Sequence, residues 1–243
     1  MKKASIILIL LLLAALPFAG YAGEAELQVA WTDIKQTFPE EGEAVYTYTC
    51  RYPVLSGIPA AEGINDFYRT TVSEMVELVL PMYANDEDMA FSGGNAFDQV
   101  YEITCNNGRY FSTRMLQKQI LGDREIATVH SQVFDVSGAY AGEMLTLRGL
   151  LEEVGESSAQ LAEAVFEDIW QKIEKQQADG ASPWNQDLDK DTLGLDFFPE
   201  EHFYADEEGR AVFYLQPGLF RQDQEIVTFT YTAQEVLALL TQQ

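Results

Sequence analysis

The apolar positions of the chain follow two periods, one helical and one typical of strands. Ile64 to Tyr83 and Ser158 to Gln176 each carry an apolar stripe on one helical face. Alternation of apolar and polar residues predicts strands over Val45 to Tyr52, Phe97 to Cys105, Arg109 to Lys118, Glu125 to Val136, His202 to Ala205, Arg210 to Leu215 and Ile226 to Tyr231. Thr232 and Glu235 form a capping box ahead of a short terminal helix.

The order strand, helix, hairpin occurs twice, which predicts an α+β protein of two similar halves. The boundaries that follow are residues 44–120 for the first half and residues 121–243 for the second. Each half is expected to pack one helix on a mainly antiparallel sheet. An acidic segment, residues 23–43, reads as irregular and precedes the first strand.

Charge narrows the range of partners. The 243 residues contain 15 Lys and Arg against 39 Asp and Glu, a formal net charge of -24. Such a surface repels phosphates and anionic lipid headgroups, which argues against nucleic acid and favours a basic partner. Hydrophobic residues make up 47% of the chain, so the charge belongs to a folded protein with a sizeable core.

The first 22 residues have the pattern of a signal peptide. Lys2 and Lys3 precede an apolar run from Ala4 to Ala19, and Gly20-Tyr21-Ala22 offers a cleavage site after Ala22. A retained transmembrane anchor is the alternative, but the apolar run is shorter than the roughly 20 residues that a bilayer requires. We therefore expect an exported protein without further membrane segments.

Export affects the interpretation of the two cysteines, because a disulfide can persist outside the cytoplasm. Cys50 and Cys105 both lie in predicted strands, and a bond between them would stabilise the fold by about 4 kcal/mol in the chain-entropy model. Two buried free thiols are the alternative. The sequence favours the disulfide without establishing it.

Motifs for catalysis are absent from the sequence. His130 and His202 lack the spacing of a zinc site, and neither has a nucleophile signature beside it. Ser92-Gly93-Gly94 lacks the lysine of a phosphate-binding loop. The sequence thus implies no cofactor, no metal and no catalytic residues, and both histidines are interpreted as strand residues with satisfied rings.

One acidic run is a candidate binding segment. Asp187, Asp189 and Asp191 alternate within a predicted loop, between Asn185 and Asp196. The alternation resembles a calcium loop, but Lys190 stands where such a loop needs Gly and Asp196 where it needs Glu. A solvated acidic loop that meets a basic partner is the preferred interpretation.

Several short segments resemble a known family of exported bacterial domains of unknown function. They are Tyr52-Pro53-Val54, Ile58-Pro59, Gly63 to Tyr68, Val129-His130-Ser131, Phe134 to Gly138, Leu145 to Leu151, Phe197 to Tyr204, Val212 to Pro217 and Ile226 to Phe229. The same domain pair forms the extracellular part of RsiV, the lysozyme-sensing anti-sigma factor, and precedes the catalytic domain of the peptidoglycan deacetylase PdaC. The resemblance implies an exported, non-catalytic binding domain for lysozyme-like proteins or cell-wall glycan.

Two functional hypotheses follow. The first is an RsiV-like binding module that recruits a basic envelope protein such as lysozyme, or peptidoglycan. The second is a small envelope hydrolase that uses a pair of carboxylates. A hydrolase requires two carboxylates at catalytic separation in a concave pocket, whereas a binding module requires an exposed acidic face.

Overall fold

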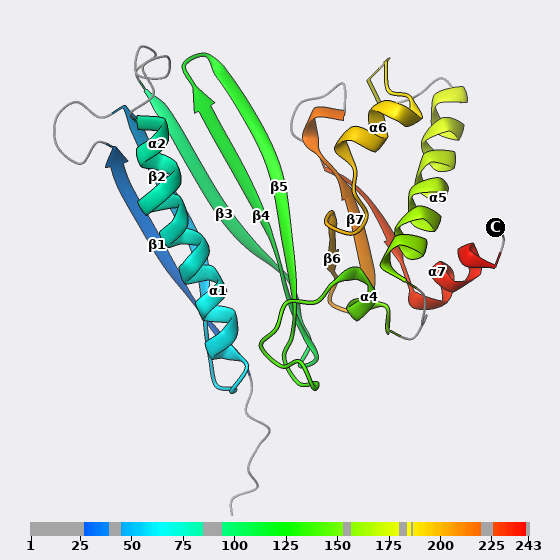
Figure 1. The fold of residues 1–243 in the computed structure, drawn as a ribbon, viewed down its shortest axis with the longest axis horizontal. Helices are drawn as coiled ribbons and strands as arrows, with labels where there is room; N and C mark the ends of the chain where they lie inside the picture. The colour runs from blue at the N-terminus through cyan, green and yellow to red at the C-terminus, as the bar shows by residue number, and fades with distance from the viewer. Residues whose placement is uncertain are drawn as a thin grey trace, which may run out of the picture.

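The computed structural model describes residues 27–38, 45–84, 94–152, 157–179, 184–185, 187–219 and 226–241. The predicted signal peptide lies outside these ranges and remains a prediction. Among the described residues, no helix is long and apolar enough to cross a membrane. The fold is α+β, as predicted, with one sheet of five strands and another of three (Figure 1).

The N-terminal unit, residues 27–135, is built on the five-stranded sheet. Its strands are β1 (Gln28–Phe38), β2 (Tyr46–Ser56), β3 (Asn95–Asn106), β4 (Tyr110–Leu121) and β5 (Arg124–Asp135), and they pair in chain order. All neighbours are antiparallel except β2 and β3. The helical segment between β2 and β3 explains that exception, because parallel neighbours require a crossover connection.

The crossover covers one face of this sheet (Figure 1). It comprises α1 (Ala61–Glu74), the π-helix η1 (Met75–Val79) and α2 (Leu80–Ala84). The predicted stripe is confirmed, since Ile64, Tyr68 and Val72 are buried. The Tyr68 ring meets the Tyr101 ring edge-on at 5.1 Å, so aromatic packing joins the helix to β3.

The prediction of an irregular N-terminal segment is wrong for β1. The segment Gln28–Phe38 pairs with β2 along its whole length. Its one acid, Asp33, lies opposite Arg51, whose guanidinium also stacks on the Trp31 ring at 5.0 Å. The acidic composition that suggested a loop belongs to the flanking residues, whereas the strand itself alternates in burial.

The boundary predicted between residues 120 and 121 placed β5 in the wrong unit. It pairs with β4 from Tyr110 opposite Asp135 to Leu121 opposite Arg124, so it belongs to the first sheet and not to the second half. Gly122, with φ of 62°, permits the tight turn between the two strands. The sheet therefore continues through residue 121, where the sequence suggested a division.

The C-terminal unit, residues 147–241, packs helices on the smaller sheet. Its elements are α4 (Leu147–Leu150), α5 (Ser158–Ala178), α6 (Lys190–Asp196), β6 (Phe203–Ala205), β7 (Ala211–Leu215), η3 (Pro217–Leu219), β8 (Val227–Tyr231) and α7 (Ala233–Leu240). The sheet is antiparallel in the order β6-β7-β8. The predicted helix at Ser158 is confirmed, with Ser157 and Gln160 forming a capping box.

A bulge in β3 joins the two units. The pairing of β3 with β4 shifts between Ile103 and Cys105, so that Cys105 lies opposite Ser112. Because side chains alternate between faces, the extra residue moves Cys105 to the face opposite α1. There Cys105, Tyr110 and Val133 join the core of the C-terminal unit.

The position of Cys105 along β3 overturns the predicted disulfide. Cys50 lies opposite Gln99, and Cys105 is six residues further along β3. At about 3.3 Å per strand residue, the two α-carbons are about 20 Å apart, well beyond the roughly 7 Å that a disulfide spans. Both cysteines are free and buried, Cys50 in the core under α1 and Cys105 in the other core.

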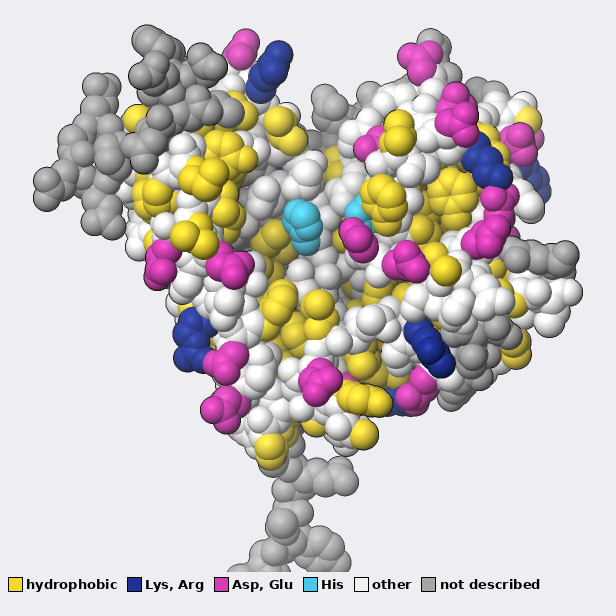
Figure 2. Space-filling model, viewed as in Figure 1, with side chains coloured by type: hydrophobic (Ala, Val, Ile, Leu, Met, Phe, Trp, Pro, Cys, Tyr) yellow, Lys and Arg dark blue, Asp and Glu magenta, His cyan; other side chains and the backbone are white. Residues whose placement is uncertain are grey.

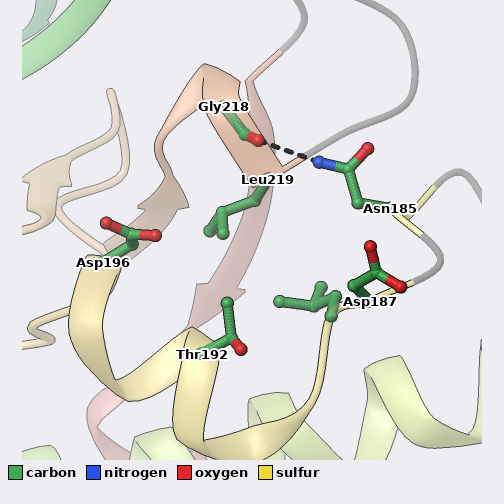
Figure 3. Close-up of a pocket in the computed structure, with 7 residues that line it drawn as sticks. Asn185, Asp187, Thr192, Asp196, Gly218 and Leu219 are labelled. Atoms are coloured by element: carbon green, nitrogen blue, oxygen red, sulfur yellow. Dashed lines mark hydrogen bonds between the residues drawn. The ribbon is translucent and has the colours of Figure 1, made fainter.

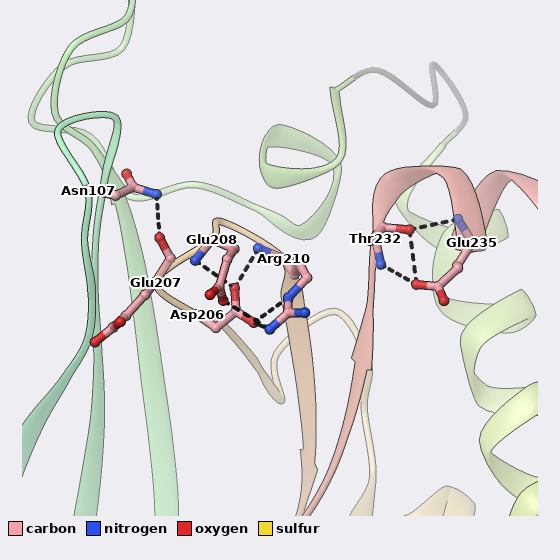
Figure 4. A network of polar contacts seen from close by, with 7 residues as sticks. All are labelled: Asn107, Asp206, Glu207, Glu208, Arg210, Thr232 and Glu235. Atoms are coloured by element: carbon pink, nitrogen blue, oxygen red, sulfur yellow. Dashed lines mark hydrogen bonds and ion pairs between the residues drawn. The ribbon is translucent and has the colours of Figure 1, made fainter.

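The β3–β4 turn of the N-terminal unit meets the β6–β7 turn of the C-terminal unit (Figure 4). Asn107 Nδ2 donates to the Glu207 carbonyl oxygen at 3.2 Å. Within the second turn, the Asp206 carboxylate accepts from the backbone N–H groups of Glu208 and Arg210 and from Arg210 Nε, at 3.2, 2.9 and 2.7 Å. The Asn107–Glu207 bond thus links the β6–β7 turn to the β3–β4 hairpin, and the Asp206 bonds maintain the shape of the β6–β7 turn.

The capping box of α7 is confirmed in the same region (Figure 4). Thr232 Oγ1 accepts from the Glu235 N–H at 3.2 Å, and the Glu235 carboxylate accepts from the Thr232 N–H at 2.7 Å. The hydrogen bond from the Thr232 N–H is the main reason why the pKa of Glu235 is lowered. The motif was visible in the sequence because all its contacts are local.

Candidate functional site

The acidic run becomes the start of a helix and not the loop that its composition suggested. Asp189 is the N-cap of α6, and its carboxylate accepts from the Thr192 N–H at 2.8 Å. That hydrogen bond is the main reason why the pKa of Asp189 is lowered. Asp191 lies in the first turn of α6, where a negative charge interacts favourably with the helix dipole. Two of the three aspartates thus have a local structural role.

Asp187 and Asp196 both line an open cavity of about 540 Å³ (Figure 3). The two carboxylates lie at opposite ends of it, with Leu188 and Leu219 forming apolar parts of the wall. Asn185 holds one side, because its Nδ2 donates to the Gly218 carbonyl oxygen at 3.0 Å. The cavity therefore offers carboxylates beside apolar carbon, which suits a cationic side chain with an aliphatic stem.

The arrangement does not support the calcium interpretation. Asp189 and Asp191 are not part of the cavity wall. Within the described ranges, no three His, Cys, Asp or Glu side chains come close enough to hold a metal ion. The alternation that resembled a calcium loop is explained by helix capping and by the cavity.

An exposed acidic and apolar surface continues from α6 into the turn that follows it. Leu195 is 75% exposed and Phe198 is 46% exposed. Around them in the chain lie the exposed carboxylates of Asp191, Asp196, Glu200 and Glu201. No Lys or Arg occurs between Lys190 and Arg210. We call residues 191–201 the α6 surface, and it combines protruding apolar groups with negative charge only.

A cleft of about 390 Å³ lies between the two units, beside the α6 surface. Both histidines of the chain line it, and Figure 2 shows them (cyan) in the hollow between the two parts of the molecule. Its wall is formed by Phe67, His130, Ser131, Gln132, Val133, Met144, Leu145, Thr146, Glu200, Glu201, His202, Phe203 and Tyr214. Side chains that are 72 positions apart in the sequence thus share one environment.

Burial is the main cause that lowers the pKa of both histidines. The His202 ring packs among Phe197, Phe198 and Tyr214, with ring centroids 6.1, 5.8 and 5.4 Å away. His130 adds a repulsive charge when protonated, whereas Glu201 and Asp196 act in the opposite direction. Burial therefore favours the neutral form of both rings.

Sequence reasoning missed most of the groups that build the cleft. It placed His130 and His202 in strands with satisfied rings, and His202 Nδ1 does accept a hydrogen bond, from the Phe198 N–H at 3.2 Å. His130 lies in β5, while His202 immediately precedes β6. Only their scarcity, two in 243 residues, could have drawn attention to them.

The fold resembles that of solved proteins of unknown function. A DUF3298 family protein from Bacteroides fragilis superimposes with a TM-score of 0.50 at 12% identity, covering 90% of this chain and 98% of that one. A DUF3298 family protein from Pseudomonas aeruginosa PAO1 gives a TM-score of 0.41 at 11% identity, covering 66% of this chain and 75% of that one. At such identity the Bacteroides likeness shows a shared fold alone.

No family model matches the sequence of this chain, and no curated protein sequence matches it. The chain is therefore an α+β protein whose fold resembles that of a DUF3298 family protein. Its role has to be argued from its own residues.

Proposed function

We propose that this chain is an exported, non-catalytic binding domain, RsiV-like in role, whose partner is a strongly basic protein such as a lysozyme. The observation that carries the proposal is the α6 surface, where Leu195 and Phe198 are exposed among carboxylates with no Lys or Arg beside them in the chain. The net charge of -24 supports it, because a field of one sign attracts an oppositely charged partner from a distance.

Interface physics explains why this combination suits a protein partner. Binding energy concentrates in a few apolar groups that become desolvated at the centre, while charges around them guide association and select the partner. Leu195 and Phe198 are such centre groups, and Asp196 and Glu200 are such charges. The nearby cavity of Asp187 and Asp196 would accept a Lys or Arg side chain of the same partner.

Export is part of the proposal and rests on residues 1–22, which lie outside the described ranges. The charged start, the apolar run and the site after Ala22 support it. Intact mass of the protein released from cells tests it directly. A mature chain that begins at Gly23 supports export, whereas a retained Met1 in the cell fraction contradicts it.

A hydrolase remains the second candidate because Asp187 and Asp196 line one cavity. A carboxylate pair around a cavity is the arrangement that glycoside hydrolysis uses. Incubation with peptidoglycan and analysis of released fragments tests this candidate. Turnover that disappears in both Asp187→Asn and Asp196→Asn would replace the binding proposal, and binding of intact glycan without turnover would redirect it to the cell wall.

The binding test uses immobilised mature chain and a lysozyme in solution, at about 50 and 300 mM salt. We expect affinity to fall as salt rises, and Leu195→Ser to weaken binding at least tenfold. Leu237→Ser is the matched control, because Leu237 is 45% exposed on α7, away from the α6 surface. Equal effects of the two substitutions, or no binding at low salt, would reject the proposal.

A further inference from the structure

The side chain of Gln216 joins the two units through the backbone of Val129. Gln216 Oε1 accepts from the Val129 N–H at 2.9 Å, and Gln216 Nε2 donates to the Val129 carbonyl oxygen at 2.8 Å. Val129 lies in β5, at the edge of the five-stranded sheet, and is fully buried. Both bonds would be lost if the amide were flipped, so they determine which end of Gln216 is the NH2 group.

That NH2 group also faces His202. Gln216 Nε2 lies 3.4 Å from His202 Nε2, and the other ring nitrogen, Nδ1, faces the Phe198 N–H at 3.2 Å. Each nitrogen of the imidazole is therefore opposite a hydrogen-bond donor. One of those donors holds the junction at Val129, and the other belongs to the α6 surface.

Two donors around one imidazole make the neutral ring the favoured form. A neutral imidazole has one acceptor nitrogen, so either tautomer satisfies one of the two donors. An imidazolium has N–H groups at both positions and satisfies neither. Protonation of His202 thus opposes its contact with Phe198 and its contact with Gln216 at the same time.

We propose that His202 is an acid-sensitive latch: the neutral ring accepts a hydrogen bond from one of its two neighbouring donors, whereas the protonated ring repels both the Gln216 amide and the Phe198 N–H. The latch rests on contacts within the chain, so it goes beyond the proposed binding function and does not depend on it. Release weakens the hold of Gln216 on the Val129 N–H, whereas the Val129 carbonyl keeps a second donor, the Tyr214 hydroxyl at 3.3 Å.

The charged groups around the ring set the pH at which release occurs. His130, in β5, disfavours a positive charge on His202. Glu201, next to His202 in the chain, and Asp196, at the end of α6, favour that charge. Glu200 lines the same cleft, and Tyr214 approaches from β7. Exclusion of water is the largest effect and lowers the pKa of His202, so release lies below the usual range near pH 6.5.

Amide hydrogen exchange at Val129 tests the latch, because its N–H is held by Gln216. We expect its protection factor to fall between pH 7 and pH 5, by up to about tenfold for each pH unit over which one proton is taken up. The Phe111 amide in β4, within the N-terminal core, is the internal reference for global unfolding and should change less. A Val129 amide that follows Phe111 at every pH would overturn the proposal.

The matched variants are His202→Asn and His130→Asn. Asn at 202 keeps an acceptor for the Phe198 N–H but does not titrate, so the acid-dependent loss of protection should disappear. His130→Asn should retain that loss, because His130 makes neither contact in the latch. If His202→Asn retains the full pH dependence, the latch is rejected, and the wild-type comparison of Val129 with Phe111 decides the matter if either variant fails to fold.

Discussion

Gly63 in α1 approaches Gly142 so closely that a Cβ atom added to Gly63 would lie 2.9 Å from the Gly142 carbonyl oxygen. Gly142 itself has φ of 92° and follows the turn at Asp135, whose carbonyl oxygen accepts from the Gly142 N–H at 2.8 Å. The start of α1 is therefore seated directly on the segment that leaves β5, backbone against backbone.

This contact predicts the effect of alanine at position 63. In an exposed helix, Gly→Ala stabilises by about 0.5–1 kcal/mol. Gly63→Ala should instead destabilise, by about 1–3 kcal/mol, because a backbone carbonyl cannot give way without moving the turn. Gly194→Ala in α6 is the control, since its new Cβ would meet only Phe166 at 3.8 Å and should stabilise. Denaturant unfolding of both variants measures the difference, and equal signs would contradict the close contact.

The two cysteines are expected to remain thiols after export. Burial raises the pKa of Cys105 to about 11 and also raises that of Cys50, so neither forms the reactive thiolate readily. Iodoacetamide should leave the folded protein unmodified and add two groups in denaturant without a reducing agent. An intact mass 2 Da below that of the dithiol, with no alkylation after unfolding, would show that the chain folds differently around β3.

The acidic run predicts the kinetics of association with a basic protein. Asp187→Asn, Asp189→Asn and Asp191→Asn together should slow association severalfold at low salt and change dissociation little, because these charges act before the contact is desolvated. The fold should survive, since Asn at 189 can still cap α6. Biolayer interferometry separates the two rates. The same triple variant tests calcium, because a melting temperature that rises with calcium in the wild type alone would restore the metal interpretation.

Stability should depend on pH through the two histidines. Both have a lowered pKa in the folded state, so as the pH falls below about 6.5 the unfolded chain binds more protons and the free energy of unfolding decreases. For His202 the slope is at most about 1.4 kcal/mol per pH unit. Urea unfolding of the wild type and of a His130→Asn, His202→Asn double variant measures the effect. The double variant should be nearly flat over that range, and a slope as steep as that of the wild type would show that other groups titrate.

Local patterns in the sequence were sufficient for the long helices, the terminal helix, the β3–β4 hairpin and the α+β class. The stripes of α1 and α5 and the Thr232–Glu235 box depend on residues three or four positions apart, so their geometry follows from the helix itself. The hairpin formed by the strands predicted at Phe97 to Cys105 and Arg109 to Lys118 is local in the same sense. These elements were predicted correctly because the interactions that define them lie within one segment.

Tertiary contacts determined three features of the protein. These are the pairing of β1 within the five-stranded sheet, the face of that sheet on which Cys105 lies, and the residues that line the cleft. One extra residue near Thr104 reverses the facing of Cys105, and no period in the sequence marks it. Gln216 reaches Val129 across 87 positions, and His202 meets that amide only because β6 and β7 lie beside β5. Strand register and long-range pairing are determined by which surfaces bury one another, so the site at the junction could not be deduced from hydrophobic period alone.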